Sequence, residues 1–152
     1  MLLHKNKKLL LCSYPVGNDI PGWTRIAGVM ASIIKKHADK VEDIALLVTG
    51  SSGAIIGTLV ASKLKNYNVK VKHLKKDGEK SHSMPIPRVF EYEKCFILDD
   101  QVSTGETLAR LLYKFQTDVE AIIVIDRVEM DVIKSIEKNY LVNHFYCLNY
   151  TE

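Results

Sequence analysis

The chain has 152 residues, of which 47% are hydrophobic and 26% are charged, and these proportions predict one compact domain over residues 1–152. The net charge of +3 argues against an obligate nucleic-acid-binding protein, which usually carries a strongly basic face. No apolar run approaches the ~20 residues of a transmembrane helix, the N-terminus lacks the long apolar region of a signal peptide, and no Cys/His spacing indicates zinc. We therefore expect a cytoplasmic protein with neither nucleic acid nor a membrane as its partner.

Apolar residues recur at helical spacing in some segments and form short continuous runs in others. Strands are predicted over 44–49, 69–74, 93–99, 120–126 and 142–148, and helices over 25–37, from the turn at 49–53 to about residue 65, from residue 107 onward and over 130–138. Residues 75–88 show no regular period, and a mobile loop of that length in a small domain is usually functional. The alternation favours an α/β fold with an open, mostly parallel, twisted sheet and helices on both faces.

Polar residues follow three of the predicted strands at their carboxyl ends. These are Thr49-Gly50, Asp99-Asp100 and Asp126-Arg127. Open parallel sheets bind their ligands at the carboxyl ends of the strands. The three polar clusters are therefore expected to converge on one site.

Residues 95–107 carry the most specific signal, because an apolar strand runs into two adjacent carboxylates and a short turn. Asp99 and Asp100 can accept hydrogen bonds from two neighbouring hydroxyls, directly or through Mg²⁺. Residues 103–107 offer hydroxyls and backbone N–H groups at a helix N-terminus, where phosphate binds well. The arrangement suits a sugar phosphate. A plain strand–helix turn with a threonine cap is the alternative, but it does not explain the tandem aspartates.

This segment closely resembles the 5-phosphoribosyl-1-pyrophosphate (PRPP) signature of type I phosphoribosyltransferases: four mostly apolar residues, two acids, three variable residues, then Thr-Gly-x-Thr. Gln101 departs mildly from the usual residue type. The likeness covers about residues 44–148 and implies that Asp99 and Asp100 hold the ribose hydroxyls. It implies Mg²⁺ as the cofactor, carried by PRPP near this pair rather than bound directly by the protein. The residues that it assigns to the 5′-phosphate are Ser103, Thr104, Gly105, Glu106 and Thr107.

Two further loops are similar to those that handle pyrophosphate in this family. The turn after the strand 44–49 resembles the pyrophosphate loop at Gly50, Ser51, Ser52 and Gly53, with an ordinary turn as the alternative. The loop 75–88 is similar to the mobile loop of the orotate branch, which carries a basic pair and then Lys-x-His, although this chain holds one extra residue. A solvated surface loop is the alternative. The residues that the likeness implicates here are Lys75, Lys76, Lys80 and His82.

Arg127 lies where orotate phosphoribosyltransferases carry the arginine that contacts the orotate carboxylate, although Met130 replaces a glycine. A surface ion pair with Glu129 or Asp131 is the alternative. Residues 1–22 are too few for the longer N-terminal hood of these enzymes, so a reduced hood is expected. Trp23 would either stack on a base there or pack in the core.

The resemblance thus implies an enzyme that transfers 5-phosphoribosyl from PRPP to a nucleobase and releases pyrophosphate. Orotate is the favoured base. Enzymes of this family are commonly dimers, so a homodimer is expected. A purine-type phosphoribosyltransferase and a non-catalytic regulatory protein that binds PRPP or a nucleotide are the alternatives.

Overall fold

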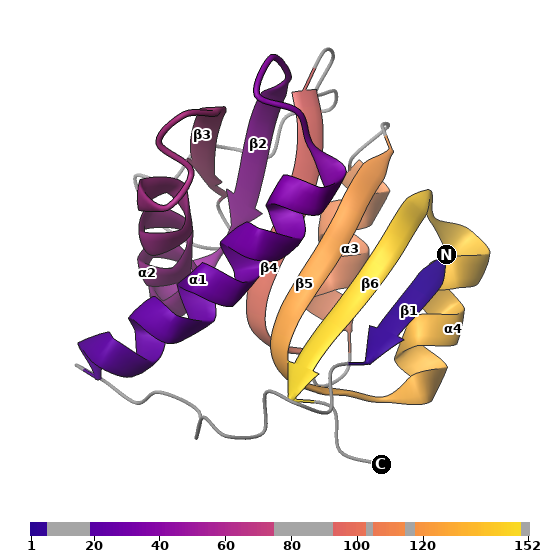
Figure 1. The fold of residues 1–152 in the computed structure, drawn as a ribbon. Helices are drawn as coiled ribbons and strands as arrows, with labels where there is room; N and C mark the ends of the chain where they lie inside the picture. Colours follow the sequence, from indigo (N-terminus) through magenta and orange to yellow (C-terminus); the bar gives the residue numbers. More distant parts are fainter. Residues whose placement is uncertain (6–18, 75–92, 103–104, 115–117, 150–152) are drawn as a thin grey trace.

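The computed structural model describes residues 1–5, 19–74, 93–102, 105–114 and 118–149. In these ranges six strands form one sheet, in the order β1-β6-β5-β4-β2-β3, and every neighbouring pair is parallel. The prediction of an open parallel α/β sheet is confirmed (Figure 1). The strands are β1 (Leu2–Lys5), β2 (Asp43–Val48), β3 (Asn68–His73), β4 (Glu93–Val102), β5 (Val119–Val128) and β6 (Val142–Asn149).

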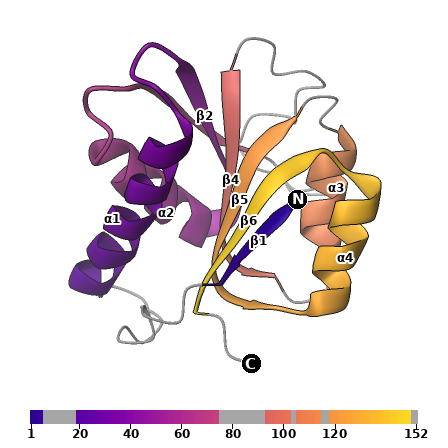
Figure 2. The same ribbon diagram turned by 45° about the vertical axis from the view of Figure 1, so that its right-hand side comes forward.

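Helices cover both faces of this sheet. Figures 1 and 2 show that the helices form one pair on each face. The first pair is α1 (Ile20–His37) and α2 (Gly50–Ser62), and the second is α3 (Glu106–Lys114) and α4 (Met130–Asn139). Of the helices in the described ranges, none is long and apolar enough to cross a membrane.

Successive side chains of β4 pack alternately into the two layers of the core, one on each face of the sheet. Phe96 and Leu98 pack in a buried cluster with residues of α1 and α2, whereas Cys95 and Ile97 pack in a second cluster with residues of α3 and α4. Successive side chains of a strand point to opposite faces. A strand buried on both faces therefore reads as a continuous apolar run, which is the pattern that predicted β4.

Helix α1 begins at Ile20, five residues before the predicted start. The Asp19 side chain accepts a hydrogen bond from the Gly22 backbone N–H at 3.1 Å, and Pro21 occupies the first turn, where its missing N–H costs nothing. Trp23 is only 4% exposed and belongs to the core between α1 and the sheet. Of its two expected roles, packing is therefore the one observed.

A strand at residues 2–5 was not predicted. Leu2 aligns with His144 and Lys5 with Cys147, so β1 lies in parallel at the edge of the sheet beside β6. Four residues are too short for a sequence period, and their pairing depends on a strand about 140 positions away. At least part of the expected hood segment 1–22 therefore extends the sheet.

Candidate functional site

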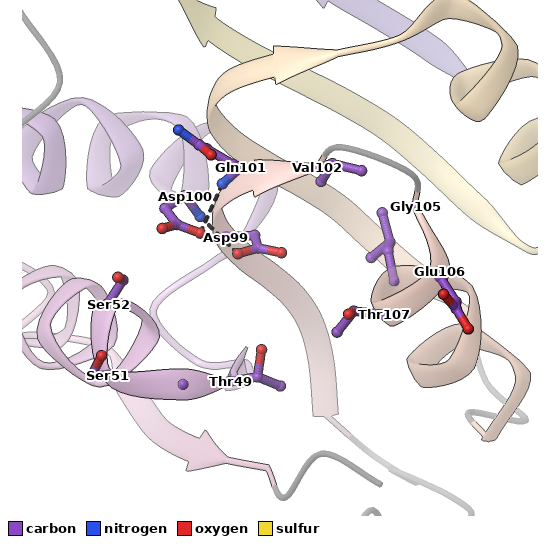
Figure 3. A pocket seen from close by; sticks show the side chains of 12 residues that line it. Thr49, Ser51, Ser52, Asp99, Asp100, Gln101, Val102, Gly105, Glu106 and Thr107 are labelled. Carbon is purple, nitrogen blue, oxygen red and sulfur yellow. Dashed lines mark hydrogen bonds between the residues drawn. The ribbon is translucent and has the colours of Figure 1, made fainter.

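The strand order places a ligand-binding position between β2 and β4. From β2 the chain continues outward to β3, whereas β4 is followed on its other side by β5. Such a reversal opens a crevice at the carboxyl ends of the two strands. A cleft of about 250 Å³ lies there, and Figure 3 shows the residues that line it: Thr49, Gly50, Ser51, Ser52, Asp99, Asp100, Gln101, Val102, Gly105, Glu106, Thr107 and Leu108.

The acid pair occupies the middle of this cleft. Asp99 Oδ1 accepts a hydrogen bond from the Asp100 backbone N–H, and Asp100 Oδ1 accepts one from the Gln101 N–H, both at 2.8 Å. In Figure 3 the Asp100 carboxylate lies on the side of α2 and the Asp99 carboxylate on the side of α3. Both are partly buried. The pair therefore presents acceptor oxygens on both sides of the strand end.

On one side of the acid pair lies the N-terminus of α2. Gly50 has a φ of +71°, a conformation that side chains disfavour and glycine allows. Thr49 is the N-cap residue but makes no side-chain capping hydrogen bond. The first backbone N–H groups of α2 are donors that suit an anion. Ser51 and Ser52, predicted for this role with Gly50 and Gly53, line the cleft, whereas Gly53 faces Val48 of the sheet.

His73, at the end of β3, supports this loop and was missed by the sequence analysis. Its Nε2 donates a hydrogen bond to the Gly50 carbonyl at 2.8 Å. The contact joins residues 23 positions apart. A histidine at the end of a predicted strand was the only available signal, and nothing in the sequence connected it to Gly50.

On the other side of the acid pair lies the N-terminus of α3. Gly105 has a φ of +76°, and its carbonyl accepts the Ala109 N–H at 2.8 Å. The helix begins at Glu106, one residue earlier than predicted. The Glu106 carboxylate is paired with Arg110 one turn later. Thr107 lines the cleft, so three residues of the predicted phosphate loop are present at the site.

Several predicted site residues lie outside the described ranges. They are Lys75, Lys76, Lys80, His82, Ser103 and Thr104. The backbone of Arg127 belongs to the end of β5, where Asp126 is aligned with Gln101 of β4. Arg127 thus belongs to the strand next to the acid pair, and its side chain is not among those that the structure describes.

No protein-family profile matches the chain. No curated protein sequence matches it either.

Solved structures that are similar to this chain at high probability include the following two. UMP synthase of Leishmania donovani matches with a TM-score of 0.55 and 16% identity over 90% of this chain, which spans only 33% of that protein. Hypoxanthine phosphoribosyltransferase of Trypanosoma cruzi matches with a TM-score of 0.44 and 15% identity over 81% of this chain and 74% of its own. Identities this low establish the architecture and not the chemistry, and the chain has the type I phosphoribosyltransferase fold.

Proposed function

We propose that the protein transfers the 5-phosphoribosyl group of PRPP to a nucleobase and releases pyrophosphate. The observation that carries the proposal is the position of Asp99 and Asp100 between two helix N-termini in one cleft. PRPP is a ribose with a phosphate group at one end and pyrophosphate at the other. Its site therefore requires hydrogen-bond acceptors for the ribose hydroxyls in the middle and hydrogen-bond donors for the anionic groups on both sides.

The 5′-phosphate is assigned to the N-terminus of α3. Backbone N–H groups and the Thr107 hydroxyl are donors there, together with Ser103 and Thr104, whose role rests on the signature alone. The helix dipole favours a negative charge at this end. Glu106 opposes that charge, but its pairing with Arg110 partly neutralises it.

Pyrophosphate is assigned to the N-terminus of α2, across the acid pair from α3. Gly50 to Gly53 would supply backbone and hydroxyl donors. Lys75, Lys76, Lys80 and His82 would add charge from the loop 75–88, an assignment that rests on the sequence resemblance. Lysines that meet the leaving group stabilise charge that grows in the transition state.

The cleft also suits Mg²⁺ that enters with PRPP. The carboxylates of Asp99 and Asp100 are hard oxygen donors, the ligand type that Mg²⁺ prefers, and one or two carboxylates with substrate phosphates are its usual protein environment. When bound, the ion would offset part of the pyrophosphate charge.

The chemical step needs no protein nucleophile. The bond from ribose C1 to the pyrophosphate oxygen breaks, and its electron pair leaves with pyrophosphate. A nitrogen of the base forms the new bond to C1, and the proton of that nitrogen passes to pyrophosphate or to water. Asp99 and Asp100 orient the ribose and sit near the positive charge that develops on the ring. Most of the acceleration would therefore come from positioning and charge stabilisation.

The proposed base is orotate, and the support is the position of Arg127 at the end of β5. A guanidinium can grip a planar carboxylate with two N–H groups. The fold is equally compatible with a purine as the acceptor.

Mg²⁺-dependent release of pyrophosphate from PRPP tests both the reaction and the choice of base. It is measured separately with orotate, uracil, adenine, hypoxanthine, guanine and xanthine. Release of pyrophosphate with one base would support the proposed transferase activity. Binding of PRPP without release on any base would reject that activity and favour a regulatory PRPP-binding protein.

Arg127→Ala should raise the KM for orotate by on the order of 10- to 100-fold, because the carboxylate loses a charge-assisted, bidentate partner. The KM for PRPP should change much less. Arg25→Ala, which removes an exposed arginine of α1, is the matched control and should alter neither constant. Steady-state kinetics with each substrate varied in turn give the comparison. Equal changes in both KM values would contradict the role of Arg127.

His73→Ala should raise the KM for PRPP about fivefold, because the Gly50 carbonyl loses a hydrogen bond of roughly 1 kcal/mol that holds the pyrophosphate loop. Inhibition by added pyrophosphate should weaken by a similar factor. The KM for the base should stay the same, since His73 lies on the β3 side of the cleft. If inhibition by pyrophosphate is unchanged, the His73 contact does not position the loop.

A further inference from the structure

A second polar cluster lies away from the cleft, near the start of β5 and β6. Glu120 is the second residue of β5 and His144 the third of β6, and His37 is the last residue of α1. The acid pair, in contrast, lies near the end of β4. One ligand atom from each of the three residues lies within 4.8 Å of the other two. Two imidazoles and one carboxylate therefore converge on the α1 face of the sheet.

The distances fit a small ion. His37 Nδ1 lies 3.3 Å and His144 Nε2 lies 4.0 Å from the same oxygen, Glu120 Oε1. The donor atoms of a tetrahedral Zn²⁺ with bonds of about 2.0–2.1 Å are roughly 3.4 Å apart. Small side-chain rotations would thus bring all three atoms to bonding distance.

Each histidine of the cluster has its other ring nitrogen held by a neighbour. His37 Nε2 lies 2.5 Å from the Tyr146 hydroxyl, and His144 Nδ1 lies 3.0 Å from His4 Nε2. When the ring proton is donated to these neighbours, the lone pairs of His37 Nδ1 and His144 Nε2 face Glu120. Outer hydrogen bonds of this kind orient the histidine ligands of metal sites.

The carboxylate is oriented in the same way. Asn143 Nδ2 donates a hydrogen bond to Glu120 Oε2 at 3.0 Å, which leaves Oε1 directed at the two imidazoles. Lys94, a nearby cation, contacts the backbone carbonyl of His37 and is paired with Glu42.

The cluster is accessible without being fully exposed. The side chains of His37, Glu120 and His144 are 14%, 18% and 22% exposed, so an ion can enter while most of the site excludes water. Burial lowers the pKa of His37 and the neighbouring His144 lowers it further, although Glu120 opposes the change.

We propose that His37, Glu120 and His144 form a binding site for Zn²⁺, with water in the fourth position. Imidazole nitrogens select borderline transition metals over Mg²⁺, which prefers oxygen ligands. The ion would join the end of α1 to β5 and β6, and hence stabilise the folded state. The site is separate from the proposed PRPP cleft and does not depend on that function.

Calorimetric titration of chelator-treated protein with Zn²⁺, together with metal analysis after dialysis, tests the site. The wild-type protein should bind one Zn²⁺ per chain at this site and unfold at a higher temperature with zinc than without it. His37→Ala plus His144→Ala should weaken that binding on the order of 100-fold or more, and Tyr146→Phe, which removes only an orienting partner, roughly 10-fold. Glu120→Gln keeps the size of the side chain and should also bind Zn²⁺ more weakly. Because this change disturbs packing little, weaker binding by the variant would not be explained by a loss of the fold.

Two controls separate this site from other zinc ligands. His73→Ala removes a histidine outside the cluster, and Asp99→Asn plus Asp100→Asn removes the carboxylates of the cleft. Both variants should bind zinc with the wild-type affinity at the proposed site. The proposal is overturned if the wild-type protein binds no zinc, if Glu120→Gln binds it equally well, or if the acid-pair variant loses it.

Discussion

The Asp99→Asn plus Asp100→Asn variant is expected to lose pyrophosphate release by on the order of 10³-fold, since two charges next to the reacting ribose are removed. The fold should survive. Each asparagine keeps a side-chain oxygen that can accept the backbone N–H now bound by the aspartate at 2.8 Å. Initial rates from PRPP with the preferred base measure the loss of pyrophosphate release. The thermal midpoint shows whether the fold is retained.

A matched control for this experiment is Asp43→Asn plus Asp118→Asn. Both aspartates are exposed. Asp43 is the first residue of β2 and Asp118 directly precedes β5, so both lie away from the cleft. The control removes the same amount of charge from the protein. Its rate should be that of the wild type. Unchanged activity in the acid-pair variant would reject the proposed function, and an equal loss in the control would assign the effect to net charge.

Gly105→Ala is expected to lower the free energy of unfolding by roughly 2–4 kcal/mol, through two separate effects. The φ of +76° strains any residue with a side chain. A Cβ atom at this position would also lie only 2.5 Å from Val132 Cγ1 in α4. Urea denaturation of the purified variant gives the value.

Val132→Ala distinguishes the backbone strain from the clash. Combined with Gly105→Ala, it removes the contact but leaves φ unchanged, so the double variant should be about 1 kcal/mol more stable than the sum of the single effects predicts. Strict additivity would show that α4 does not restrict this turn. Since Gly105 also belongs to the proposed phosphate loop, its substitution should weaken PRPP binding even in the double variant.

Most of the sheet was predictable from local sequence. The strands β2 to β6 and the four helices have periods or apolar runs long enough to be recognised, and their ends agree with the structure within a few residues, except at the start of α1. The acid pair and the turn at Gly105 were recognisable because adjacent carboxylates and a Thr-Gly-x-Thr turn occupy consecutive positions. The proposed chemistry of this part of the site therefore rests on about ten neighbouring residues.

The remaining features depend on contacts between distant segments. Strand β1 exists because β6 offers it an edge, and His73 reaches Gly50 only after β3 has paired with β2. His37, Glu120 and His144 come from a helix end and two strands with no shared spacing. Short-range periodicity carries no information on such pairings, because side chains far apart in the chain become neighbours only when the sheet order is set. Local sequence was sufficient for β2 to β6, the four helices and the signature loop. The pairing of β1 with β6, the contact of His73 with Gly50 and the cluster of His37, Glu120 and His144 were decided by the tertiary structure alone.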